Sequence, residues 1–205
     1  MKQTFSVVAL AIAAYAGATL TVQAQEAVAR AKAAAFDNKM FAGSPGAKGY
    51  ACFVRQYDAN HLTQHPQQKV SAMKLLVTAE ERAEDKTLSY SFRLGIGYRH
   101  RTGNFDSSGY CNHAVATDAA GEVRLDCSVD CEGGGINVAL SKDDKSAIIR
   151  LQKIQVWNRD KPDAEAGDAL VAGADDKVFR LDRADAGQCA ELVTDRKELA
   201  ALRHK

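Results

Sequence analysis

Residues 122–151, EVRLDCSVDCEGGGINVALSKDDKSAIIRL, contain segments with the pattern of half-buried β-strands. Over residues 122–129 every second residue is apolar, and most of the residues between are charged. Because successive side chains of a strand point to opposite faces, this alternation predicts a strand with one dry face. Residues 136–141 and 146–151 predict a hairpin around the sequence KDDK. If Ser141 faces Ser146, Val138 lies opposite Ile149 and the apolar side chains share one face.

The sequence on either side of this stretch predicts further short strands. They are residues 50–57, 69–78, 88–98, 110–117, 154–157 and 177–181. The polar connector 58–68 is expected to hold a helical turn, and residues 158–176 are expected to form a long loop. Short strands separated by turns every ~8–12 residues indicate a mainly β fold. We expect an antiparallel, hairpin-connected sheet that forms a small barrel or a sandwich, with one C-terminal α-helix.

The C-terminal segment changes from the period of a strand to that of a helix. Asp185 and Gln188 have the spacing of a capping box. Apolar residues between Cys189 and Leu202 then follow roughly one helical stripe. The pattern predicts a helix over residues 186–203 that packs against the sheet.

The first residues have the composition of a secretory signal peptide. Lys2 precedes an almost uncharged apolar run over residues 5–20, and Val22-Gln23-Ala24 offers a cleavage site. An uncleaved membrane anchor is the alternative, but this run is shorter than the ~20 residues that a spanning helix needs. We therefore predict a signal peptide over 1–24, an N-terminal helix and linker over 25–49, and a single β-rich domain over 50–205.

The charge of the chain is balanced. It has 27 Lys and Arg residues against 26 Asp and Glu residues, and removal of residues 1–24 takes away one Lys and no acid. This balance excludes a global basic field for nucleic acid. No later segment has the length of a membrane span. We expect an exported protein, periplasmic or extracellular, without a membrane span once the signal peptide is removed.

Export places the thiols in an oxidising compartment, where disulfides are expected. The five cysteines are Cys52, Cys111, Cys127, Cys131 and Cys189. They allow at most two bridges, and the sequence does not choose among the possible pairings. Cys127 and Cys131 could close a tight loop, while Cys52 and Cys189 could join the first strand to the C-terminal helix.

A third pairing depends on the turn DAAG between residues 117 and 122. If this turn keeps Val115 and Val123 on one face, Cys111 lies opposite Cys127. Directly opposed residues of an antiparallel pair have the Cβ separation that a disulfide requires.

Cysteine and histidine in the same region also permit a metal site. Cys111, His113, Cys127 and Cys131 supply three sulfurs and one imidazole, a ligand set suited to tetrahedral zinc. The CxxxC spacing differs from the usual CxxC pair, and an oxidising compartment favours disulfides. We therefore assign no metal ligand and keep zinc binding as an alternative.

Three other features invite a binding interpretation. The glycines at 133–135 could form an anion-binding nest, but their acidic neighbours favour a tight strand connection. The basic segment formed by Arg93 and residues 99–101 could hold an acidic ligand, yet solvated strand ends are often basic. His61 and His65 have the spacing of one helix face, but Pro66 disfavours helical geometry at His65, so both are expected to be polar loop residues.

No catalytic motif, such as GxSxG or HExxH, occurs in the chain. We assign no catalytic or cofactor-binding residue. The first hypothesis is an exported, non-enzymatic β-domain that binds a small ligand, a protein or an envelope component. The alternatives are an exported hydrolase whose active-site residues meet only in three dimensions, and the zinc-binding protein.

The intact mass of the exported protein tests the predicted processing. We expect a chain that lacks residues 1–24, because the apolar run is too short to remain as an anchor. Non-reducing peptide mapping of the same sample should recover disulfide-linked peptides. A full-length chain with five alkylatable thiols would contradict both expectations.

Overall fold

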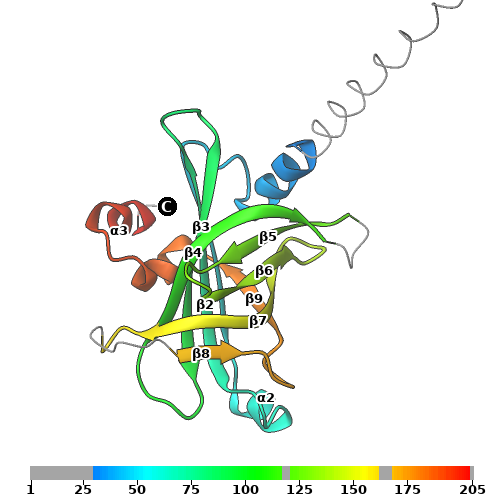
Figure 1. Cartoon of the computed structure of the whole chain (residues 1–205), viewed down its shortest axis with the longest axis vertical. Coiled ribbons are helices and arrows are strands. Elements are labelled where there is room, and N and C mark those ends of the chain that lie inside the picture. The colour runs from blue at the N-terminus through cyan, green and yellow to red at the C-terminus, as the bar shows by residue number, and fades with distance from the viewer. Residues whose placement is uncertain (1–29, 117–120, 162–167, 204–205) are drawn as a thin grey trace, which may run out of the picture.

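The computed structural model describes residues 30–116, 121–161 and 168–203 of the chain (Figure 1). The predicted signal peptide lies outside these ranges, as does the start of the predicted N-terminal helix. Residues 30–40 are helical. The rest is mainly β, as the sequence predicts. The described strands are β1 (Lys48–Gln56), β2 (Val70–Glu81), β3 (Leu88–Tyr98), β4 (Phe105–Val115), β5 (Val123–Ser128), β6 (Gly134–Leu140), β7 (Ser146–Asn158), β8 (Asp168–Val171) and β9 (Val178–Ala184).

The described strands form one antiparallel sheet that closes into a ring. Each strand from β1 to β7 pairs with the next, β7 also pairs with β9, and β9 pairs back with β1. The short β8 is added to β7 outside this ring, and the start of β4 also reaches the end of β7. These additional pairings make the ring different from a regular barrel.

The predicted registers around β5 and β6 are confirmed. Val138 pairs with Ile149, and the Ser141 backbone N–H donates to the carbonyl of Ser146 at 2.8 Å. On the other side of β5, Cys111 pairs with Cys127. Burial of the apolar face explains why the register is determined locally, since a shift by one residue would expose that face.

Two predictions for residues 146–176 are wrong in detail. The strands predicted over 146–151 and 154–157 are one continuous strand, β7, which bends past a register shift between Gly135 and Ile136 of its partner β6. The predicted loop 158–176 contains β8. The four residues of β8 have little strand character by themselves, but pairing with β7 and burial of Leu170 hold them in the sheet.

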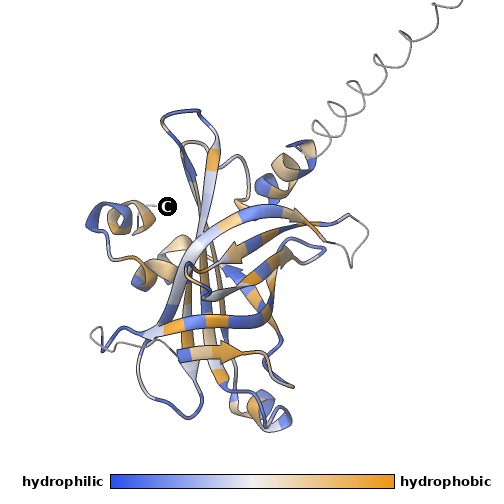
Figure 2. Cartoon of the chain, in the orientation of Figure 1, coloured by the Kyte–Doolittle hydropathy of each residue, from blue (hydrophilic) through white to orange (hydrophobic). Residues whose placement is uncertain are grey.

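Apolar side chains fill the inside of the ring. All nine described strands contribute to one buried cluster, and its largest fully buried members include Phe53, Phe92, Phe179, Leu75 and Ile149. Figure 2 shows hydrophobic and hydrophilic residues alternating along the strands, as a sheet with one dry face requires. A ligand site inside the ring would have to displace this packed core.

The C-terminal segment folds as two short helices, and the prediction of one helix over 186–203 is wrong. A 3₁₀ helix, η1 (Ala186–Leu192), is followed by α3 (Arg196–Arg203). The Asp185 side chain makes no capping hydrogen bond, whereas the Asp195 carboxylate accepts one from the Glu198 backbone N–H at 2.8 Å. Asp195 is therefore the residue that starts the final helix, and the predicted capping box does not form.

The same segment covers the outer face of β1 and β2. Leu192, Val193 and Leu202 form a second buried cluster with Leu76 and with the Cys52–Cys189 disulfide. A covalent link across 137 residues of sequence holds the segment in place. A bridge of this span stabilises a fold by ~2–4 kcal/mol, mainly by restricting the unfolded chain.

The remaining described helix, α2 (Ala59–Gln64), lies in the predicted connector, where the Asp58 side chain caps it. Within the three described ranges, each helix is too short or too polar to cross a lipid bilayer.

Glycine is required where β6 approaches its neighbours. A Cβ at Gly135 would lie 2.1 Å from the carbonyl oxygen of Cys127. We expect Gly135→Ala to lower the free energy of unfolding by about 3 kcal/mol, the upper range for overpacking. Urea denaturation of the oxidised protein measures this loss. Gly187→Ala is the matched control, because its new Cβ meets nothing within 4 Å. Equal stability of the two variants would contradict the steric argument.

Candidate functional site: a groove on the outer face of β5, β6 and β7

Four of the five cysteines form disulfides. The pairs are Cys111–Cys127, between opposed residues of β4 and β5, and Cys52–Cys189. Both pairs are among those that the sequence suggested. Cys131 is exposed and free. The hypothetical zinc site loses two of its ligands, because disulfide sulfurs do not supply thiolates. Among the described residues, no three His, Cys, Asp or Glu side chains are arranged to hold a metal ion.

The glycine run forms a tight corner between β5 and β6. Cys131, Glu132 and Gly134 have positive φ angles of 55°, 62° and 72°. A Cβ at Gly134 would lie 2.1 Å from the carbonyl oxygen of Lys153 on β7. At Gly134 the positive φ and the close backbone approach together require glycine, so the tight connection predicted from the sequence is confirmed.

A row of polar side chains crosses the outer face of the sheet beside this corner. Successive cross-strand partners on β4, β5, β6, β7 and β9 are Asn112, Asp126, Asn137, Arg150 and Val178. The Asn137 amide donates a hydrogen bond to Asp126 Oδ1 at 2.6 Å. The row therefore presents carboxylate, amide and guanidinium groups in a fixed order.

Arg150 has an unusual environment in this row. Its Nη1 atom is shielded from solvent and has no hydrogen-bond partner among the described residues. Its guanidinium also has no ion pair there, whereas Arg124 on the neighbouring β5 bonds Glu122 at 3.0 Å. A buried donor without a partner has an unfavourable desolvation free energy, which a bound acceptor would relieve.

The row forms the floor of two adjoining cavities that share Asp126, Asn137, Arg150 and Gln152. Their volumes are about 610 and 480 Å³. Together we call them the β5–β7 groove. The larger cavity lies against the glycine corner, and the smaller one reaches Lys177 and the first residue of β9, Val178. These volumes are those of small-molecule sites in proteins.

Four of the five large apolar residues that are exposed in the described part of the chain lie in or beside the β5–β7 groove. These five exposed residues are Tyr110, Val115, Trp157, Val171 and Val178. Val115 and Val178 line the groove itself. Tyr110 on β4 and Val171 on β8 are direct cross-strand neighbours of lining residues. The groove thus combines a polar floor with an apolar rim, as ligand sites commonly do.

An acidic residue of the N-terminal helix makes a second polar cluster. The Asp37 carboxylate accepts a hydrogen bond from the Tyr90 hydroxyl at 2.7 Å and lies 2.8 Å from His113 Nε2. Burial, together with this carboxylate, raises the pKa of the Tyr90 hydroxyl above its usual range. Arg183 fixes the same helix by donating to the carbonyls of Lys39 and Met40 at 2.9 and 2.8 Å. The cluster attaches the helix to the sheet.

Aromatic rings line a third cavity, of about 490 Å³, beside α2. The rings of Tyr57, His61 and His65 follow one another with centroid distances of 4.6 and 4.3 Å. His61 lies within α2 and bonds the buried Gln68, so the prediction of a loop position is wrong for this residue. Asp58 starts the helix early enough to include it. His65 ends the helix, as Pro66 requires.

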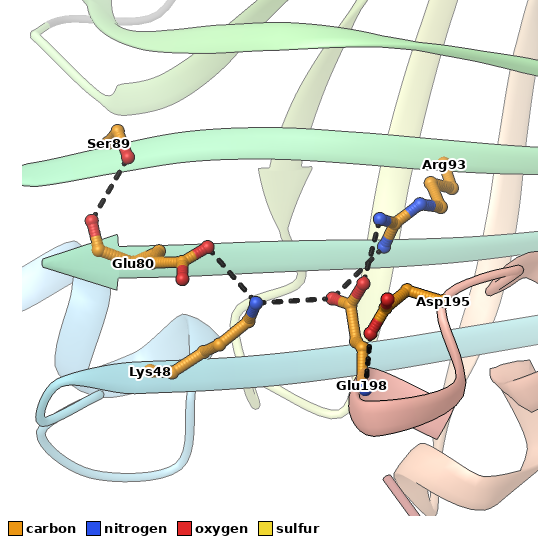
Figure 3. Close-up of polar contacts among 6 residues, drawn as sticks. All are labelled: Lys48, Glu80, Ser89, Arg93, Asp195 and Glu198. Atoms are coloured by element: carbon orange, nitrogen blue, oxygen red, sulfur yellow. Dashed lines mark hydrogen bonds and ion pairs between the residues drawn. The ribbon is translucent and has the colours of Figure 1, made fainter. Parts of the chain in front are cut away.

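The arginines of the predicted basic segment are paired. Arg93 bonds Glu198 of α3 through both terminal nitrogens, at 3.2 and 2.9 Å, and Lys48 approaches the same carboxylate at 3.5 Å (Figure 3). Burial lowers the pKa of Lys48, but the hydrogen bond to Glu80 and the charge of Glu198 outweigh it and leave the pKa raised. Arg93 thus anchors the C-terminal helix α3 to the sheet through its ion pair with Glu198.

The other two arginines are also engaged. Arg99 donates to the carbonyl of Leu62 at 3.0 Å, and Arg101 pairs with Asp168 and stacks on Phe105. The segment therefore does not present a free cluster of guanidinium groups.

Comparison with protein-family models, with curated proteins and with solved structures found no match for the chain. The groove must therefore be interpreted from its own chemistry.

Removing Asp37 tests the role of the N-terminal cluster. We expect Asp37→Ala to lower the free energy of unfolding by about 1–3 kcal/mol, because the half-buried Tyr90 hydroxyl and His113 ring lose their acceptor. Hydrogen exchange of the amides of residues 30–40 should accelerate. Asp185→Ala is the control, since this exposed carboxylate caps nothing. An unchanged exchange rate in Asp37→Ala would contradict the assignment.

The contact between Asp37 and Tyr90 should also make the free energy of unfolding depend on pH. The folded-state pKa of Tyr90 lies above its unfolded value near ~10. The protonated Tyr90 hydroxyl therefore contributes its full stabilisation below the unfolded-state pKa. This stabilisation is lost as the pH rises from the unfolded-state pKa through the folded-state pKa. In Asp37→Ala this alkaline loss should be smaller, as measured by urea denaturation between about pH 8 and pH 11.

Proposed function

We propose that the chain is an exported, non-enzymatic binding protein whose ligand occupies the β5–β7 groove. The observation that carries this proposal is the Arg150 guanidinium, which has a buried nitrogen without a partner in a cavity of about 610 Å³. Proteins pair buried donors almost always, and the Arg150 side chain also lines both cavities of the groove without an ion pair among the described residues, so the arrangement favours a site where a ligand supplies an acceptor.

Two observations support export. The apolar run over residues 5–20 has the composition of a signal peptide. The two intramolecular disulfides are typical of proteins from oxidising compartments. We infer a periplasmic or extracellular location.

The packed core favours binding on the surface of the ring. Large side chains such as Phe53 and Phe179 are 0% and 1% exposed. A ligand inside the ring would have to remove their contacts, at a free-energy loss of several kcal/mol for each side chain displaced. The β5–β7 groove requires no such rearrangement.

The alternative of a hydrolase receives less support. Asp37 and His113 are a close acid–base pair, but neither lines the β5–β7 groove or the cavity beside α2. Their third partner is the Tyr90 hydroxyl, whose raised pKa makes it a poor nucleophile. The zinc alternative is not proposed again, because Cys111 and Cys127 are bonded to each other.

Amide NMR spectra of the uniformly ¹⁵N-labelled protein, with its signal peptide removed, test the location of the site. The ligands are a panel of monosaccharides, short oligosaccharides, amino acids, nucleotides and a long-chain fatty acid. We expect shift changes on strands β5–β7 with at least one polar member of the panel. Arg150→Ala should weaken that binding about tenfold, the loss of a charged hydrogen bond. Arg196→Ala is the matched control, because it removes an exposed arginine from α3.

Two results would contradict the proposal. One is a set of shift changes confined to the amides of buried core residues with the fatty acid alone. The other is binding at the groove that is equally strong in Arg150→Ala and in the control.

A further inference from the structure

The β5–β7 groove is lined by four cationic side chains and by the carboxylates of Asp126 and Glu132, and only one of the four cations, Arg124, forms an ion pair among the described residues. Arg150, Lys153 and Lys177 line the groove and have no ion pair among the described residues. The nearest acid in the row, Asp126, already accepts a hydrogen bond from Asn137 at 2.6 Å. A planar guanidinium with several donors matches a carboxylate or phosphate better than it matches a neutral group. The charge arrangement thus favours an anionic group at Arg150.

The rest of the floor offers groups suited to hydroxyls. Asp126 has a second carboxylate oxygen, and Ser128, Asn137 and Gln152 add a hydroxyl and two amides along the same groove. The hydroxyl and the amides can donate and accept hydrogen bonds, and the carboxylate can accept them. Together they can bond several hydroxyls of one molecule at once. From Asp126 on β5 to Val178 on β9 the part of the row that lines the groove crosses three strand intervals, about 14 Å. This length fits a short chain of sugar rings.

Tyr110 supplies a flat apolar surface beside the polar row. It lies directly opposite Ser128, a lining residue, and is 65% exposed. An exposed aromatic ring on a strand has no stabilising role in the core of the fold. The C–H face of a sugar ring can stack on such a ring while its hydroxyls bond the neighbouring polar groups.

The pairing of the strands excludes the usual mode of peptide binding. Strands β5, β6 and β7 are each hydrogen-bonded on both sides where they form the floor. An extended peptide therefore finds no free backbone N–H and C=O groups to which it could add a strand. Recognition in the groove must use side chains, as saccharide recognition does.

We propose that the β5–β7 groove binds an acidic oligosaccharide, with the anionic substituent on Arg150 and a sugar ring stacked on Tyr110. This inference rests on the proposed function and specifies the ligand class of the same site. A carboxylate and a phosphate share the chemistry that Arg150 recognises, so both are included in the test.

Isothermal titration calorimetry on the oxidised protein, without its signal peptide, tests the ligand class. The probes are trigalacturonate, a phosphorylated maltotriose, neutral maltotriose, acetate and inorganic phosphate, all at one ionic strength. We expect at least one acidic trisaccharide to bind at least tenfold more tightly than maltotriose, acetate or inorganic phosphate. Trigalacturonate alone would identify a carboxylate as the anionic group, and the phosphorylated sugar alone would identify a phosphate; both outcomes support the proposal.

Variants separate the two contacts. Arg150→Ala should reduce the affinity for the acidic trisaccharide about tenfold and leave that for maltotriose unchanged. Arg150→Lys should lose less, because the charge remains. Tyr110→Ala should weaken the binding of both trisaccharides several-fold, and Tyr110→Phe should restore it. Far-ultraviolet circular dichroism and a thiol count confirm that each variant is folded and oxidised, and Arg196→Ala should bind as the wild type does.

Several results would overturn the proposal. They are equal affinity for trigalacturonate and maltotriose, tight binding of acetate or inorganic phosphate alone, or no effect of Tyr110→Ala. If the amide shifts on β5–β7 persist with another class of the panel, only the saccharide assignment fails. If no ligand of any class shifts those amides, the proposed function itself fails.

Discussion

The architecture depends on the close approach of backbone at the corner between β5, β6 and β7. Carbonyl oxygens of Cys127 and Lys153 occupy the space where Cβ atoms of Gly135 and Gly134 would lie. This contact allows β6 to pair with β5 on one side and with the bent β7 on the other. Because β7 continues to β9, and β9 to β1, the closure of the ring follows from it. The corner also fixes the register that places Asp126, Asn137 and Arg150 on the outer face.

The strand arrangement around β5 could be predicted because it is encoded locally. Alternation of apolar residues determines which face is buried, and the short turn then brings Cys111 opposite Cys127. The Cys52–Cys189 bridge could be suggested but not selected, since it joins residues 137 positions apart. Strand β8 and the continuity of β7 could not be predicted, because both depend on partners that are distant in sequence. The local pattern of Asp185 and Gln188 was misleading, as Asp195 supplies a stronger cap only ten residues later.

The candidate groove has no sequence motif, because its lining residues come from five separate strands, β4, β5, β6, β7 and β9. The position of Arg150 in the groove could still have been predicted from the register of the β6–β7 hairpin. Once Val138 and Ile149 face inward, their neighbours Asn137 and Arg150 must lie side by side on the outer face. The role of Tyr110 depends on the pairing of β4 with β5, and its exposure is visible only in the folded chain. The motifs that drew attention first are mainly structural, since four of the five cysteines form disulfides and the glycine run forms a tight corner.

Closure of the ring also limits the strand edges that are free to pair with another copy of the protein. Among the described strands only β8, at the end of the pairing order, has a side without a partner strand. It is four residues long and begins with Asp168, which pairs with Arg101. So short and charged a border offers little template for intermolecular β-sheet growth. A concentrated solution can therefore hold many molecules of this protein without their strands joining into fibrils.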